Sequence, residues 1–151
     1  MALKNVVRIL VSSVVVFSLV SAASVANARN TRHLFSIEDA MKRGPVHKLD
    51  PNIQLIFGND GPVSEQSYGL WKTNKKTNAF NKTDEDACRW VFFSALLSLQ
   101  ARARKEGGNA VVGITSVTSD FRTTSETEYM CAAGDVIAGV ALEGTVVRIA
   151  N

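Results

Sequence analysis

Two cysteines are the residues of this chain best suited to covalent chemistry. Cys88 and Cys131 make up its full cysteine content, and an even count in an exported protein favours a disulfide. A bridge across 43 positions would stabilise the fold by about 4 kcal/mol through loop entropy. The alternative, a redox-active or metal-binding thiol pair, lacks the CxxC spacing and nearby histidines that such chemistry uses. We therefore predict a structural disulfide between Cys88 and Cys131.

Histidine and carboxylate side chains are weaker candidates for a metal or catalytic site than the cysteines are for a disulfide. His33 and His47, with Asp50, could supply part of a metal site, but a predicted helix and turn separate the two histidines. We interpret both as surface histidines. Glu126 and Glu128 alternate along a predicted strand and so share a face, where such pairs usually meet solvent. The sequence predicts no metal site and no catalytic pair from these residues.

A basic segment is the third candidate. Four lysines lie within eleven consecutive residues, directly after Trp71: Lys72, Lys75, Lys76 and Lys82. One interpretation is an adhesive loop for an anionic envelope polymer, a lipid head group or a partner protein. The other is a solvated connection whose Trp71 and Phe80 pack into the core. We keep Trp71 and the four lysines as a candidate loop for an anionic partner.

Motifs of common enzyme classes are missing from the sequence. It contains no Walker phosphate loop, no dinucleotide-binding GxGxxG, no GxSxG elbow and no HExxH helix. Its composition, 46% hydrophobic and 21% charged, is that of an ordinary globular domain. We predict a protein that is not an enzyme and that uses no cofactor.

The first residues have the organisation of a secretory signal. Lys4 and Arg8 precede an apolar run, and Ala26-Asn27-Ala28 suits a signal peptidase. Serines dilute the run, whereas a membrane anchor needs about 20 strongly apolar residues; an uncleaved anchor is the alternative. Cleavage after Ala28 gives a signal peptide, 1–28, and a single domain, 29–151, in the periplasm or outside the cell. Loss of two cations lowers the formal charge from +3 to +1, so we expect neither nucleic-acid binding nor a membrane span.

Capping residues place two helices. Ser36 opens a short helix that runs to about Lys42, before Gly44-Pro45. Thr83 and three following acids open a long one, which Gly107-Gly108 ends.

Alternating apolar residues predict strands on both sides of the long helix. Residues 52–57 and 67–73 are expected to pair as an N-terminal hairpin, and 72–83 to form a loop. After the long helix, 110–117 and 126–132 form a second hairpin around a polar turn, followed by a β-rich stretch at 135–149. These elements predict an α+β fold: one long helix packed on an antiparallel sheet, with a short N-terminal helix and hairpin.

Two resemblances follow from short motifs. The first resemblance covers the chain from the long helix onwards. Its motifs are Ala101-x-Ala103, Gly108-Asn109-Ala110-Val111-Val112-Gly113-Ile114, a hairpin, and Gly144-Thr145-Val146-Val147. This part resembles the core shared by the YbjQ family, to which heavy-metal binding is ascribed, and the Rcs stress-sensor lipoprotein. The resemblance implies a metal-binding or metal-handling secreted protein as the alternative function. The chain lacks the lipid-bearing cysteine of the sensor.

The whole chain resembles a family of small, uncharacterised secreted bacterial proteins. Three segments carry this likeness: Ser36-Ile37-Glu38-Asp39-Ala40-Met41, Thr73-Asn74-Lys75-Lys76-Thr77-Asn78-Ala79-Phe80 and Thr127-Glu128-Tyr129-Met130-Cys131. Members are sometimes labelled excinuclease ATPase subunits, a label that the missing phosphate loop and the export signal contradict. The leading expectation is a non-catalytic binding or interaction module of the envelope. Its partner would be an envelope protein or an anionic envelope polymer.

Overall fold

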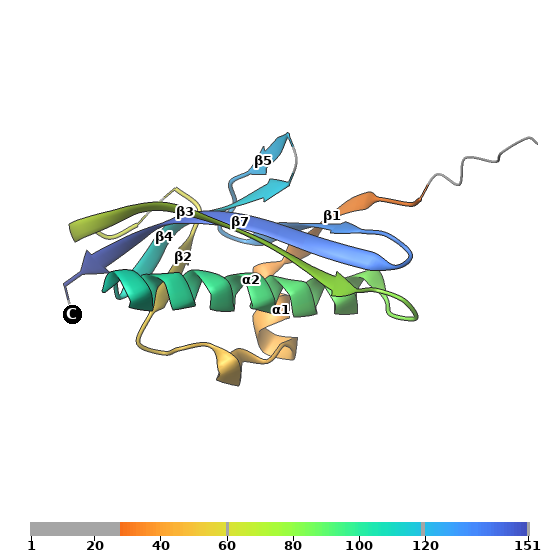
Figure 1. Cartoon of the computed structure of the whole chain (residues 1–151), viewed down its shortest axis with the longest axis horizontal. Coiled ribbons are helices and arrows are strands. Elements are labelled where there is room, and N and C mark those ends of the chain that lie inside the picture. Colours follow the sequence, from red (N-terminus) through yellow and green to blue (C-terminus); the bar gives the residue numbers. More distant parts are fainter. Residues whose placement is uncertain (1–27, 60, 119, 151) are drawn as a thin grey trace, which may run out of the picture.

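The computed structural model describes residues 28–59, 61–118 and 120–150 (Figure 1). The predicted signal peptide lies outside the described residues, apart from Ala28. One mixed sheet carries the helices on one of its faces (Figure 1). The helical elements are α1 (Ile37–Arg43), the 3-10 helix η1 (Val46–Lys48) and α2 (Asp84–Glu106). The strands are β1 (Thr31–Ser36), β2 (Gln54–Phe57), β3 (Ser64–Asn78), β4 (Ala110–Thr118), β5 (Phe121–Thr123), β6 (Glu128–Ala133) and β7 (Ile137–Ile149).

Strand β7 is the centre of the sheet. β3 pairs with it antiparallel along its whole length, from Ser64 opposite Ile149 to Asn78 opposite Ile137. The other edge of β7 is shared, because β4 pairs with its second half and β6 with its first residues. β1 extends the sheet beside β6, and β2 lies parallel to β4. β3 therefore forms an outer edge of the sheet.

The sheet corrects the fold predicted from the sequence. The class α+β fits broadly, but the described residues are dominated by seven strands, with 46% of them in strands and 27% in helical elements, and they contain two α-helices. A single long helix on an antiparallel sheet is therefore the wrong description, and β2 and β4 run parallel. Both expected hairpins are also wrong. β2 pairs with β4 and β3 with β7, while β4 pairs with β5, which lies in the predicted polar turn, and β6 pairs with β1 and β7. Alternation indicates a strand but not its partner, because backbone groups pair with any edge within reach.

Helix α2 begins and ends where its sequence predicts. The Thr83 hydroxyl accepts a hydrogen bond from the backbone N–H of Asp86 at 3.1 Å, and three acids occupy the positively polarised first turn. Gly107 ends the helix at a φ of 84°, in the left-handed region that favours glycine. Ser36 caps α1 in the same way as Thr83 caps α2. These interactions are local, so the sequence alone predicts them.

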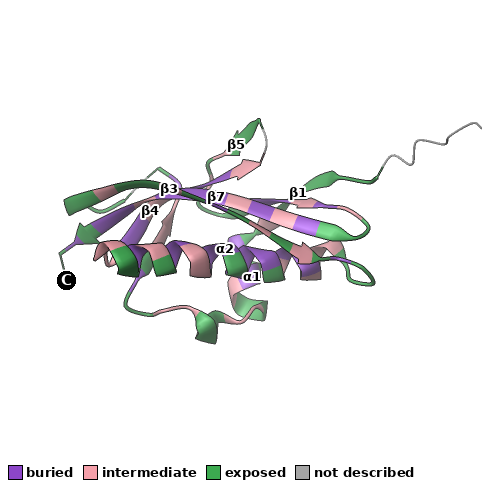
Figure 2. Cartoon of the chain, in the orientation of Figure 1, coloured by how far each residue is buried: buried purple, intermediate pink, exposed green. Residues whose placement is uncertain are grey.

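The core lies between α2 and the face of β7 that points toward it. Alternate residues of β7 are buried against the helix: Ala138, Val140, Leu142 and Val146. Figure 2 shows this alternation along β7. Gly144 continues the series without a side chain, and a Cβ there would lie 2.7 Å from Cγ1 of Val111. Its missing side chain therefore lets β4 pack closely beside β7.

Strand β5 pairs with the end of β4 and projects from the helix-free side of the sheet (Figure 1). Arg122 of β5 pairs with the carboxylate of Glu143 on β7, and Lys72 Nζ lies 3.5 Å from the second oxygen of that carboxylate. The side chain of Glu143 is only 4% exposed. Two cations therefore compensate the cost of burying this charge.

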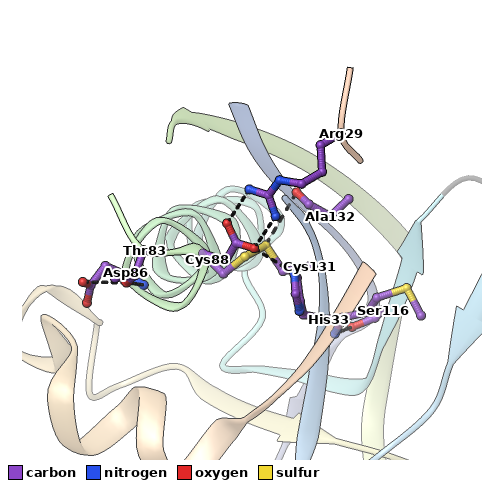
Figure 3. Close-up of a disulfide and its surroundings, with 10 residues drawn as sticks. Arg29, His33, Thr83, Asp86, Cys88, Ser116, Cys131 and Ala132 are labelled. Carbon is purple, nitrogen blue, oxygen red and sulfur yellow. Dashed lines mark hydrogen bonds and ion pairs between the residues drawn. A yellow bond between two sulfur atoms is a disulfide. The ribbon is translucent and has the colours of Figure 1, made fainter. Parts of the chain in front are cut away.

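The two cysteines are joined in a disulfide, as their sequence context predicts (Figure 3). Both residues are fully buried, and their Cα atoms lie 5.8 Å apart. The bridge links the first turns of α2 to β6. Beside it in the core, the ring of Tyr129 stacks on Phe92 at 3.8 Å between centroids. Helix and sheet are thus held by a covalent bond as well as by apolar contact.

Removal of the disulfide should destabilise the fold strongly. We expect the Cys88→Ala/Cys131→Ala variant to lose about 4 kcal/mol of unfolding free energy, because the bridge no longer restricts the unfolded chain. Urea unfolding of the oxidised protein and of the variant measures the difference. The wild type under reducing conditions should match the variant. An unchanged urea midpoint in the variant would contradict a structural role for the bridge.

Candidate functional site

The predicted basic loop is not a loop. Residues Lys72, Lys75 and Lys76 belong to β3, and only Lys82 lies in the connection from β3 to α2. The prediction was wrong because the segment has few apolar residues. An edge strand tolerates polar side chains, and every residue from Gly69 to Asn78 has a partner on β7. Backbone pairing, rather than apolar burial, holds this segment in place.

Strand geometry separates the lysines that the sequence brings together. Side chains of a strand point alternately to the two faces of the sheet. Lys75 lies opposite Val140, on the face that α2 covers, whereas Lys76 lies opposite Gly139, on the helix-free face. Lys72 also belongs to the helix-free face, where it pairs with Glu143. The five candidate residues therefore do not form one continuous site.

Trp71 lies on the helix side of β3 and packs against the core. The guanidinium of Arg102 stands 3.9 Å from the centre of its ring, an arrangement that favours a cation over an aromatic face. Trp71 and Arg102 line a groove of about 280 Å³ together with Lys72, Ser98 and Lys105. Sequence reasoning missed Arg102 and Lys105 as neighbours of Trp71, since they lie on another element. Within the described part of the chain, the buried indole N–H of Trp71 has no hydrogen-bond acceptor.

Two connections meet at the far end of β3. The backbone N–H of Ala79, just after β3, donates to the carbonyl of Val136, in the turn between β6 and β7, at 2.7 Å. The same turn is closed by a hydrogen bond of 2.9 Å from Gly134 N–H to the Ile137 carbonyl. We call a set of exposed apolar and cationic residues from these connections and the adjoining strand ends the strand-end patch: Lys76, Phe80, Lys82, Val136 and Ile137.

The strand-end patch combines apolar and cationic side chains. Phe80, Val136 and Ile137 are 61%, 59% and 53% exposed, and line one shallow depression with Lys76. Lys82 Nζ donates to the carbonyl of Asn78, in the same depression, at 2.8 Å. Sequence reasoning found both lysines, but the interpretation of this segment as a solvated connection placed Phe80 in the core, where it does not lie. It missed Val136 and Ile137, for which the only signal was the preceding Gly134-Asp135 turn.

A hollow on the helix-free face adjoins the patch. Its volume is about 500 Å³, and Lys76, Val136 and Ile137 line both features. Three residues without bulky side chains, Ala132, Gly139 and Ala141, are also among its lining residues. Thr118 contributes a hydroxyl that is buried and has no hydrogen-bond partner in the described segments. The patch therefore continues into a concave surface rather than ending at a flat strand edge.

Arg29 ties the start of the domain to this end of the fold. Its guanidinium donates two hydrogen bonds to Asp84, of 2.7 and 2.9 Å, and one to Asp135 of 2.8 Å. Nε2 of His33 also lies 2.9 Å from Asp84. The hydrogen bonds from Arg29 lower the pKa of Asp84 below its ordinary value. The first residue of the predicted mature chain is thereby attached both to α2 and to the turn of the patch.

The other candidate residues lie apart from the patch. His47 is exposed, and Asp50 accepts a hydrogen bond from Arg104 at 3.0 Å. Glu126 and Glu128 are both exposed. Among the described residues, no three His, Cys, Asp or Glu side chains are arranged to hold a metal ion.

Comparisons with family models, curated proteins and solved structures give no match for this chain. None of the helices in the described ranges is long and apolar enough to cross a membrane. The disulfide is compatible with an oxidising, extracytoplasmic compartment.

The contact between Arg29 and Asp84 should make stability depend on acid pH. A carboxylate whose pKa is lower in the folded state than the unfolded value, near 3.9, stabilises the fold above that value. This contribution is lost as the pH falls through the folded pKa. We expect Arg29→Gln to lower the urea midpoint at pH 7 and to narrow the difference between the midpoints at pH 7 and pH 3. Arg32→Gln is the matched control, because Arg32 stacks on Phe121. Equal effects of the two variants would contradict a specific role for Arg29.

Proposed function

We propose that this chain is an exported, non-catalytic binding module of the bacterial envelope and that it contacts an anionic partner through the strand-end patch. One observation carries the proposal: Lys76 lines one depression with three large apolar side chains that the fold leaves exposed, and Lys82 is bonded to the carbonyl of Asn78, which lines the same depression. Exposed apolar patches rimmed by polar residues are typical of interaction sites. The resemblance to small secreted bacterial proteins agrees with this assignment.

The charge of the patch favours an anionic partner. Lys76 has no ion pair among the described residues, and Lys82 is bonded to a neutral carbonyl. The one acid in the turn, Asp135, is engaged by Arg29. Lys72 differs from both lysines because Glu143 already compensates its charge. Cationic charge therefore remains available at the patch.

The chemistry of the patch suits binding rather than catalysis. Its members bind through charge and apolar contact, and the five residues include no nucleophile paired with a general base. A partner held in this way would be recognised by shape and charge. Export places such a module in the periplasm or outside the cell, where the disulfide is maintained.

Export itself has a direct test. Cleavage after Ala28 should leave Arg29 as the first residue, because Ala26-Asn27-Ala28 has the small residues that a signal peptidase selects. Intact-mass measurement of the protein recovered from its native host should give the mass of residues 29–151 with one disulfide. A full-length, reduced chain in the cytosol would overturn the proposed compartment.

The lysines of the patch test the proposed function. The purified protein is immobilised and exposed to envelope extract that has been separated into protein, polysaccharide and lipid fractions. We expect retention of an anionic component that weakens with salt, and at least a tenfold loss of retention in Lys76→Gln/Lys82→Gln. Folding should be unaffected, because exposed lysines contribute little to stability.

The matched control has the same change of charge on the helical layer. Lys42→Gln/Lys48→Gln alters two exposed lysines on α1 and η1. This variant should retain the component as the wild type does. Equal retention by both double variants would mean that the patch is not the binding surface.

A further inference from the structure

The strand-end patch is a fixed part of the fold rather than a loose loop. Phe80 N–H donates to the side chain of Asn78 at 2.8 Å, and Lys82 N–H donates to the carbonyl of Ala79 at 3.0 Å. The hydrogen bond between Ala79 and Val136 then joins this turn to the one between β6 and β7. In Figure 1 both connections lie at the same end of the molecule, beyond the end of β3. The fold thus holds these apolar side chains toward solvent.

A partner of the strand-end patch must offer both apolar contact and negative charge. Phe80, Val136 and Ile137 need an apolar environment, whereas Lys76 and Lys82 need anions. A polysaccharide or other polyanion can pair with the lysines but offers little apolar volume to the other three side chains. A protein partner usually contacts 20 to 30 residues on each side of an interface, far more than this patch provides. The head-group region of a bilayer supplies phosphates and an acyl boundary within about 5–10 Å of depth.

We infer that the strand-end patch docks on the surface of a bilayer that contains anionic phospholipid. This inference rests on the proposed function and names its partner. Phe80, Val136 and Ile137 enter the boundary between head groups and acyl chains, while Lys76 and Lys82 bind lipid phosphates. Asp135, the acid of this turn, shares Arg29 with Asp84, so its charge is compensated in part, and the two lysines keep the patch cationic. The protein is held at the membrane without crossing it.

Vesicle sedimentation tests the inference. Protein purified from the compartment to which the host delivers it is mixed with vesicles of phosphatidylglycerol and phosphatidylcholine, and with vesicles of phosphatidylcholine alone. We expect sedimentation with the anionic vesicles only, weakened by salt because the attraction is partly electrostatic. Phe80→Ser/Val136→Ser/Ile137→Ser and Lys76→Gln/Lys82→Gln should each reduce binding at least tenfold. Thermal unfolding checks that each variant remains folded.

A matched variant separates the patch from exposed apolar surface in general. Val63 and Leu70 are 93% and 63% exposed, and both precede the half of β3 that ends at the patch. Val63→Ser/Leu70→Ser should bind the anionic vesicles like the wild type. An equal loss of binding in this control would overturn the assignment to the strand-end patch.

The outcomes also separate this inference from the proposed function. The wild type could fail to bind anionic vesicles and still retain an anionic protein or polysaccharide through Lys76 and Lys82. In that case the bilayer inference fails and the proposed function stands. If the wild type binds neither vesicles nor any envelope fraction, both fail. Equal binding to phosphatidylcholine alone would remove the role assigned to the lysines.

Discussion

The two-sided pairing of β7 is the constraint on which the rest of this structure depends. One edge of β7 is occupied by β3 over its full length, and the other is divided between β4 and β6. Its alternate side chains supply the surface on which α2 packs. A strand with both edges paired and one face covered can move little without breaking several sets of contacts. Gly144 completes this arrangement because it leaves room for Val111.

The beginning of α2 is held to the sheet by several kinds of interaction. The disulfide joins Cys88 to β6, and Asp84 in the same first turns contacts both Arg29 and His33. Arg29 in turn contacts Asp135, which lies between β6 and β7. Covalent, ionic and backbone interactions thus converge on the end of the molecule that carries the strand-end patch. Such support allows apolar side chains to remain exposed there without collapsing onto the core.

The positions of the basic residues show why lysines that are close together in the sequence need not share one surface of the folded protein. Lys72 compensates the buried Glu143, while Lys75 lies on the helix side of the sheet. Only Lys76 and Lys82 reach the patch, where Lys76 lines one depression with Val136 and Ile137 from a distant segment. Meanwhile Trp71 gains Arg102 as its neighbour from α2. The proposed contact with a membrane surface therefore uses a set of residues that no single stretch of sequence contains.

The sequence by itself determined the features that depend on neighbouring residues. Ser36, Thr83 and Gly107 set helix ends through hydrogen bonds and backbone conformations within one turn, and the two cysteines had only each other to bond within the chain. The tertiary structure decided which strands pair, including the parallel contact of β2 with β4 and the position of β3 along β7. It also decided that Phe80 stays outside the core. The reason is that strand pairing is non-local: a polar segment such as β3 becomes a strand only when a distant edge satisfies its backbone, and that edge determines which of its side chains share a face.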